Sequence, residues 1–149
     1  MTLQQMLMAD LRQAMKRGDD SRRSLIRLVL AEVKNAEIDK GAALDDPEVI
    51  DVISRQAKRH RESIAGFSKG NRQDLVAQEE AELAIILEYL PQQMSREEIV
   101  EAARSAIEQV GARGPGDKGK VMSQLMPQLK GRAQGREINE VVSELLVDS

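Results

Sequence analysis

Hydrophobic residues recur at steps of three and four along nearly the whole chain, and no stretch alternates apolar and polar residues as a half-buried strand does. This spacing predicts four longer helices followed by three shorter ones, each with one apolar face. The longer helices are expected from Thr2 to Gly18, from Asp19 to Gly41, from Asp46 to about Gly66 and from Asn71 to Leu90. The shorter ones are expected after Ser95, through Val121 to Met126, and from Ile138 to Leu146. The fold class that follows is all-α.

Polar residues just before these apolar segments mark several helix starts. Thr2 with Gln5, and Ser95 with Glu98, have the spacing of capping boxes. Asp46 before Pro47 fits a capping carboxylate followed by proline at the first helical position. The inward face of the second helix is expected to carry five aliphatic residues: Leu25, Leu28, Val29, Val33 and Ile38.

Pro91 interrupts the pattern and is the best internal boundary, because proline ends a helix. We therefore expect a larger amino-terminal helical subdomain of about four helices over residues 1–91 and a small three-helix subdomain over residues 92–149.

Composition narrows the chemistry. The 149 residues include one Phe, one Tyr and no Trp, so the core must be aliphatic. The absence of cysteine excludes disulfides, thiolate metal sites and thiol catalysis. No apolar run approaches the length of a membrane span, and Asp10 and Arg12 come too early for a secretory apolar region. The expectation is a soluble, cytoplasmic protein without a membrane partner.

The net charge of −3 does not suggest nucleic-acid binding, but the charges are unevenly distributed. Basic residues outnumber acids from Arg12 to Lys34 and again from Arg55 to Arg72. Such runs are most often the solvated face of a helix, and they can also form a surface that follows phosphates.

The segment from Gly114 to Lys120 superficially resembles a phosphate-binding P-loop. That loop requires Ser or Thr where this chain has Val121, and it lies between a strand and a helix, whereas no strand is predicted here. A weaker possibility survives: a helix starting near Asp117 would offer free backbone N–H groups beside Lys118 and Lys120, which suits a phosphate oxygen. Alternatively, Asp117 is a cap and the glycines, Gly119 among them, only relax the turn and allow close packing.

The segment from Lys130 to Arg136 is similarly ambiguous. Gly131 and Gly135 are both able to take positive φ in a tight connection between helices. Lys130, Arg132 and Arg136 would then project from a short loop where phosphates can reach them.

Candidates for catalysis are poor. His60 is the only histidine and lies among basic neighbours, which disfavours a metal ligand or general base. Glu79 and Glu82 share a helix face, with Asp74 nearby in sequence, but no histidine lies at ligand spacing along that helix. We therefore assign no catalytic residue, no metal site and no cofactor.

Four motifs occur in a characteristic order: Tyr89-Leu-Pro-Gln-Gln93, the Ser95–Glu98 capping box, Gly119-Lys-Val-Met122 and Gly131-Arg-Ala-Gln-Gly135. Together they resemble the YqeY-like proteins, whose domain is shared with the tail of the B subunit of glutamine-dependent aspartyl/glutamyl-tRNA amidotransferase. The amino-terminal half is also similar to that family, at Arg22–Arg27, Arg59–Ile64, Asn71–Leu75 and Glu79–Glu82. The resemblance implies an all-α fold with a small three-helix end, and a tail that contacts tRNA while catalysis lies elsewhere. Lys118 and Gln134 depart from the family pattern and make this copy more basic.

The leading hypothesis is a non-catalytic accessory module of translation that binds tRNA or another structured RNA. Five basic residues would contact backbone phosphates: Lys118, Lys120, Lys130, Arg132 and Arg136.

The alternative is a module that docks on an aminoacyl-tRNA synthetase or amidotransferase through exposed aliphatic residues of its last three helices. The family label also implies a carbon–nitrogen ligase with glutamine as amido-N-donor, but the residues offer neither a glutaminase nucleophile nor an ATP site.

Overall fold

The computed structural model describes residues 1–147, and the regular elements in that range are all helices, which confirms the predicted all-α class. Seven α-helices and one short 3-10 helix, η1, make up the described chain, without a strand. They are α1 (Leu3–Arg17), α2 (Asp20–Lys40), α3 (Asp46–Lys69), α4 (Gln73–Leu87), α5 (Arg96–Val110), η1 (Pro115–Asp117), α6 (Lys118–Leu129) and α7 (Gly135–Val147). None of these helices combines the length and the apolar character needed to cross a membrane.

Contacts between the elements divide the chain into two compact units, unit 1 (Met1–Leu90) and unit 2 (Pro91–Ser149). Unit 1 holds α1 to α4, and unit 2 holds α5, η1, α6 and α7. Each unit has its own cluster of buried aliphatic side chains.

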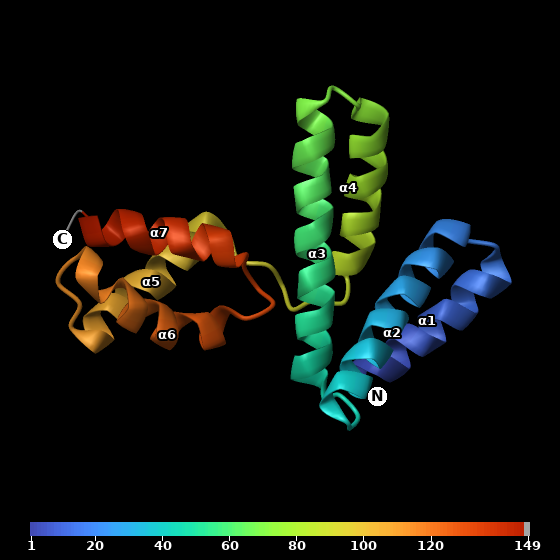
Figure 1. Cartoon of the computed structure of the whole chain (residues 1–149), viewed down its shortest axis with the longest axis horizontal. Coiled ribbons are helices and arrows are strands. Elements are labelled where there is room, and N and C mark those ends of the chain that lie inside the picture. The colour runs from blue at the N-terminus through green and yellow to red at the C-terminus, as the bar shows by residue number, and fades with distance from the viewer. Residues whose placement is uncertain (148–149) are drawn as a thin grey trace. The chain divides into compact units, whose positions relative to one another are not determined.

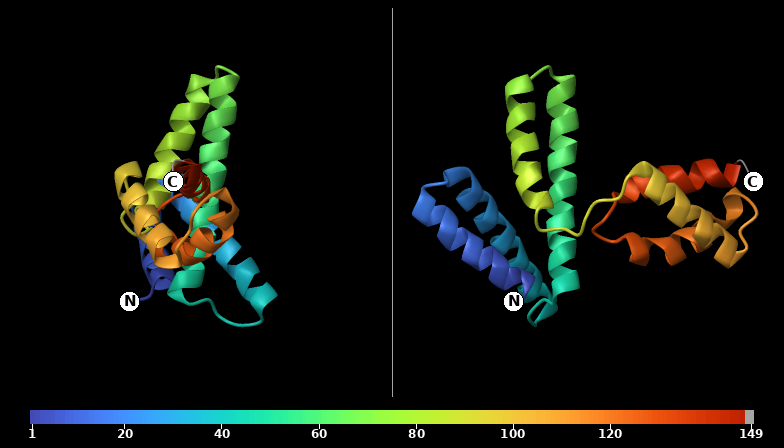
Figure 2. Two further views of the ribbon diagram at one scale, coloured as in Figure 1. Left: turned by 90° about the vertical axis from the view of Figure 1, so that its left-hand side faces the viewer. Right: turned by 180° about the vertical axis from the view of Figure 1, so that it is seen from behind.

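Unit 1 consists of two helical hairpins, α1 with α2 and α3 with α4, which lie side by side in Figure 1. The two hairpins meet near the end of α2 and the start of α3, and they diverge toward their connecting loops, as the right-hand view of Figure 2 also shows. The core between them is aliphatic and includes Leu7, Ile26, Val29, Val33, Val49, Val52, Ile53 and Ile86. Each such side chain contributes about 1.5–3 kcal/mol when it leaves water.

The inward face of α2 differs from the prediction at two positions. Leu28 is 46% exposed and Ile38 is 69% exposed, whereas Ile26 is buried. On a helix with 3.6 residues per turn, the face through Leu25 and Val33 includes position 26 and excludes positions 28 and 38. The apolar side chains at 28 and 38 therefore point to solvent.

The predicted capping boxes of α1 and α5 are confirmed. The cap of α3 is shifted by one residue, because Asp45, not Asp46, accepts the Glu48 N–H and forms a reciprocal box with the Glu48 side chain. The Asp46 carboxylate instead accepts the Leu3 N–H at 3.0 Å, which links the first turn of α1 to the start of α3. Asp46 is thus a contact between helices and not a cap.

The connection between α3 and α4 is shorter than predicted. α3 continues to Lys69, beyond the expected end at Gly66, and α4 begins only at Gln73. Asn71 lies between them with φ of 56°, a left-handed conformation that asparagine tolerates better than most residues. The result is a tight hairpin turn.

Tyr89 follows α4 and packs against the core of unit 1. Its hydroxyl donates a hydrogen bond to the Asp10 carboxylate on α1. Burial and then this hydrogen bond raise the pKa of the Tyr89 hydroxyl well above its ordinary value, so the group stays a neutral donor. Tyr89 therefore links the end of unit 1 to its first helix.

Unit 2 packs α5, α6 and α7 around a second aliphatic core. That core includes Ile99, Ala103, Val121, Leu125, Ile138, Val142 and Leu146. Val121, the residue that argued against a P-loop, is fully buried there. Met126, which the pattern placed on the apolar face of α6, is 39% exposed.

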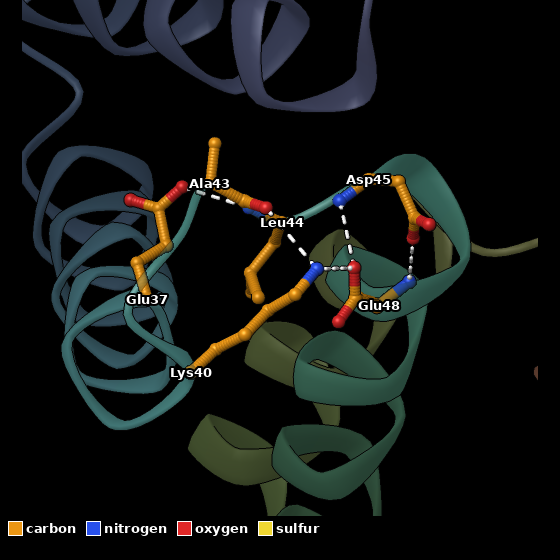
Figure 3. Close-up of polar contacts among 6 residues, drawn as sticks. All are labelled: Glu37, Lys40, Ala43, Leu44, Asp45 and Glu48. Atoms are coloured by element: carbon orange, nitrogen blue, oxygen red, sulfur yellow. Dashed lines mark hydrogen bonds and ion pairs between the residues drawn. The ribbon is translucent and has the colours of Figure 1, made fainter.

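Polar contacts at Lys40 and Glu48 close the loop between α2 and α3 (Figure 3). The Lys40 Nζ lies 2.6 Å from the Glu48 Oε1, which also accepts the Asp45 N–H at 3.1 Å. On the other side of the loop, the Glu37 carboxylate accepts the Leu44 N–H at 3.0 Å. These bonds fix the chain between the two hairpins of unit 1.

The hydrogen bond from Lys40, followed by those from Asp45, lowers the pKa of the Glu48 carboxyl below its ordinary value of 4.5. A carboxyl with a lowered pKa in the folded state contributes stability above its unfolded pKa, and this stability is lost as pH falls through the folded pKa.

We expect Lys40→Ala to move the pKa of Glu48 back toward 4.5 in an NMR titration of the side-chain carboxyl. Lys34→Ala, at an exposed lysine of the same helix, should leave it unchanged. An unchanged Glu48 pKa in the Lys40 variant would contradict this role.

Candidate functional site

The first glycine-rich loop folds into η1 and runs directly into α6. The Asp117 N–H donates to the Gly114 carbonyl at 3.0 Å, and the Lys118 N–H donates to the Pro115 carbonyl. Two of the backbone N–H groups at this helix start, those of Asp117 and Lys118, are therefore already bonded. Asp117 does not cap α6 with its side chain, because its carboxylate accepts the Arg113 N–H at 3.0 Å. The start of α6 is consequently less suited to an anion than the sequence predicts.

The two lysines of this helix start have different surroundings. The Lys118 Nζ lies 2.6 Å from the Asn139 Oδ1, so this partly buried side chain connects α6 to α7. The Lys120 side chain is 73% exposed, and its Nζ is 3.9 Å from the Asp117 Oδ1. A Cβ at Gly119 would meet nothing within 4 Å, so close packing does not require glycine there. Lys118 is a structural contact and Lys120 projects into solvent.

The two glycines of the second loop also differ. Gly131 has the left-handed conformation considered for it, with φ of 77°. Gly135 does not; it begins α7, and a Cβ there would lie 3.6 Å from the Met126 Cε. A side chain at Gly135 would therefore make only an ordinary van der Waals contact with α6, and the residue does not form a left-handed turn.

Gln93 connects this second loop to the segment after Pro91. Its Nε2 donates to the Gly131 carbonyl at 2.7 Å and to the Pro91 carbonyl at 2.9 Å. Both amide hydrogens of one partly buried side chain are thus used to hold two main-chain oxygens.

Arg132 adds two further bonds to the same segment. The Met94 N–H donates to the Arg132 carbonyl at 2.8 Å, and the Arg132 Nε donates to the Gln92 carbonyl at 3.2 Å. The bonds from Gln93 and Arg132 form a polar clamp between Pro91–Met94 and Gly131–Arg132. Arg132 is therefore part of the scaffold of unit 2.

The remaining basic residues of the predicted site lie at the surface. The Arg136 side chain is 88% exposed, with its Nε 3.6 Å from the Glu140 Oε1. Lys130 is exposed at the end of α6. Because Asn139 lies one turn after Arg136, the bond from Lys118 brings the start of α6 to the part of α7 that carries Arg136. Lys120 and Arg136 are two exposed cations beside this contact.

The basic stretch of α3 is partly compensated. Arg59 lies 3.4 Å from Glu32 on α2, and Arg72 pairs with Asp74 at 3.1 Å. Arg55 and Lys58 are exposed on the same helix. This stretch is therefore mainly a solvated helix face, with some positive charge remaining.

A cluster that the sequence did not predict lies between α3 and α4. The buried His60 has its Nε2 3.0 Å from the Glu82 Oε2 and 3.6 Å from the Glu79 Oε2. Spacing within one helix cannot reveal this contact, because the histidine comes from the neighbouring helix. One signal was available: His60 and Glu82 are equidistant in sequence from Asn71, so a hairpin turning at Asn71 places them opposite each other.

The contribution of the polar clamp to stability is testable by substitution of Gln93. Gln93→Glu replaces the amide donor with a carboxylate that faces two carbonyl oxygens, so we expect unit 2 to lose about 1–3 kcal/mol of stability. Gln92→Glu makes the same chemical change at an exposed neighbour and should stay within about 0.5 kcal/mol of the unchanged protein. Urea unfolding followed by circular dichroism measures both. Equal stability of the two variants would show that the Gln93 bonds contribute nothing.

Comparison with known proteins finds relatives that are named as mitochondrial proteins. The chain is 44% identical over 87 residues to "Altered inheritance of mitochondria protein 41, mitochondrial" of Lachancea thermotolerans, a match that covers 58% of this chain and 46% of that protein. The protein of the same name from Pyrenophora tritici-repentis is 31% identical over 143 residues, covering 94% of this chain and 78% of the relative. The Eremothecium gossypii protein is 41% identical over 85 residues, covering 56% and 46%.

These relatives correct one expectation. They are named as mitochondrial proteins, which contradicts the cytoplasmic location expected from the sequence. The chain spans about half the length of the first two fungal relatives, 46% in each case. Composition could not have revealed a compartment, since absence of cysteine is compatible with several.

A family model described as "Yqey-like protein" matches residues 4–146, which is nearly the whole chain and includes both units. The resemblance carried by the four motifs is thereby confirmed, and the chain belongs to the YqeY-like protein family.

Proposed function

We propose that this YqeY-like chain is a non-catalytic accessory module that binds tRNA or another structured RNA through backbone phosphates. The observation that carries the proposal is the exposure of Lys120 and Arg136, at 73% and 88% of their side chains. Their acidic partners lie 3.9 and 3.6 Å away. Exposed pairs of this kind contribute about 0–1 kcal/mol, so a phosphate can replace the acid at little cost.

The five basic residues proposed to contact phosphates have different surroundings. Lys118 and Arg132 hold unit 2 together, and their alteration would confuse folding with binding. Lys120 and Arg136 are therefore the primary phosphate contacts, and Lys130 is a further one at the loop.

Base stacking contributes little in this proposal. Tyr89 packs in unit 1 with its hydroxyl bonded to Asp10, and Phe67 is half-buried. Without further aromatic residues the chain offers no stacking platform, so affinity rests on phosphates and on the shape of the RNA.

The expected behaviour is a steep loss of tRNA affinity with salt, because each neutralised phosphate releases counterions. Lys120→Ala and Arg136→Ala should each reduce the slope of log affinity against log salt by about 0.7–0.9, the value for one phosphate. Fluorescence anisotropy with labelled tRNA measures this slope.

Arg104→Ala is the matched control for this experiment, because it removes one exposed charge from α5 of the same unit. It should leave the slope unchanged. A slope lowered equally by all three variants would refute these contacts, and no binding to the unaltered protein at low salt would refute the RNA proposal.

A second candidate function, docking on an aminoacyl-tRNA synthetase or an amidotransferase, is favoured by one specific observation. The exposed apolar residues of the described chain lie mainly in unit 1, and not only on the last three helices: Met6, Met8 and Met15 on α1 are 43–50% exposed, as is Leu28 on α2. Methionine-rich surfaces adapt readily to protein partners. Unit 2 offers Met126 and Val147.

If docking is the function, capture of such an enzyme should survive nuclease treatment and should be lost in Met8→Gln/Met15→Gln. Met126→Gln alters one exposed methionine of unit 2 and should leave capture intact. Capture that disappears with nuclease would instead assign the association to RNA. The readout is a pull-down with purified enzyme before and after nuclease.

A further inference from the structure

His60 lies at the centre of a compact group of three potential metal ligands. Its side chain is only 8% exposed, while those of Glu79 and Glu82 are 22% and 28% exposed. One ligand atom from each residue lies within 4.8 Å of the other two. The histidine comes from α3 and both carboxylates come from α4, so the group joins the two helices of one hairpin.

Hydrogen bonding fixes the orientation of the imidazole ring. The His60 Nδ1 lies 2.9 Å from the main-chain carbonyl of Gln56, one turn earlier on α3. A carbonyl oxygen only accepts, so Nδ1 carries a hydrogen and donates it. The Nε2 is therefore the atom that faces Glu82 at 3.0 Å and Glu79 at 3.6 Å.

If the His60 ring is neutral, no positive charge lies between its Nε2 and the two carboxylates. The Nε2 lone pair would then point toward two carboxylates, which are acceptors as well. A cation between the three groups removes this repulsion, and it can be either a proton on Nε2 or a metal ion. His60 has a positive side chain on either side of it in sequence, Arg59 and Arg61. The Arg59 guanidinium is directed to Glu32 on α2, at 3.4 Å.

We propose that His60, Glu79 and Glu82 bind a divalent transition metal ion, with Zn²⁺ as the best match. Tetrahedral Zn²⁺ with bonds of about 2.0–2.1 Å to nitrogen and oxygen holds its ligand atoms about 3.3 Å apart. The two distances from Nε2 to the carboxylates, 3.0 and 3.6 Å, lie on either side of that value. Small side-chain movements would bring these two pairs of atoms to the tetrahedral spacing, and the ligand oxygens of Glu79 and Glu82 lie within 4.8 Å of each other.

The surroundings of the ring match those of a metal-binding histidine. Such histidines almost always donate the other ring N–H to a carboxylate or a main-chain carbonyl, as His60 does to Gln56. Three protein ligands leave at least one coordination position for another group. Bound metal would connect α3 to α4 within unit 1 and stabilise that hairpin.

Zinc titration of the full chain without an affinity tag tests the proposal, since the chain has one histidine. Isothermal titration calorimetry should show one Zn²⁺ bound per chain, and Zn²⁺ should raise the thermal midpoint. Glu79→Gln and Glu82→Gln should each weaken Zn²⁺ binding by about tenfold or more. Glu80→Gln removes an exposed carboxylate from the same helix and should bind like the unaltered chain.

The thermal midpoint without metal shows whether each variant folds, and Glu79→Gln keeps the bond between His60 and Glu82 as a second, milder change. No Zn²⁺ uptake by the folded unaltered chain at tens of micromolar would overturn the proposal and leave a proton on Nε2 as the cation. Uptake that is equal in Glu79→Gln, Glu82→Gln and Glu80→Gln would also overturn it, because the metal would then lie elsewhere.

Discussion

The polar clamp between Pro91–Met94 and Gly131–Arg132 is the constraint on which unit 2 depends. Three short helices bury an aliphatic core without Phe, Tyr or Trp, and a unit of this size gains little from burial alone. The clamp adds hydrogen bonds from Gln93 and Arg132 that join the first residues of the unit to the connection between α6 and α7. Because the clamp uses Arg132, it also determines which cations remain available at the surface.

The family motifs acquire a structural explanation from these contacts. In the first motif, Tyr89 belongs to unit 1, where it bonds to Asp10, while Gln93 belongs to unit 2 and bonds to Gly131. Gly131 has the positive φ that favours glycine. Membership of the YqeY-like family is therefore recognised mainly through residues that stabilise the fold. Of the cations proposed to contact RNA, Lys120 lies inside the Gly119–Met122 motif and Arg136 directly follows the Gly131–Gly135 motif, and both are distinguished by their exposure.

Local chemistry made most of the helices predictable, since periodicity and capping act within a few residues. The boxes at Thr2 and Ser95 and the end of α1 at Gly18 followed from this. Leu28 was misassigned because it lies just outside the buried face of α2, next to residues that belong to it. Contacts between distant segments depend on how helices pair, which no pattern within one helix encodes. The bond between Lys118 and Asn139 is of this kind, and the approach of His60 to Glu82 was indicated only by their equal distance in sequence from the turn at Asn71.

Native-state hydrogen exchange of the Met94 amide tests the central claim most directly, because this N–H donates to the Arg132 carbonyl across the clamp. If the clamp is part of the folding unit, the amide should exchange only when unit 2 opens, with the same free energy as the core amides of Leu125 and Val142. Exchange of Met94 at the rate of an unstructured peptide, while those two amides stay protected, would contradict the account.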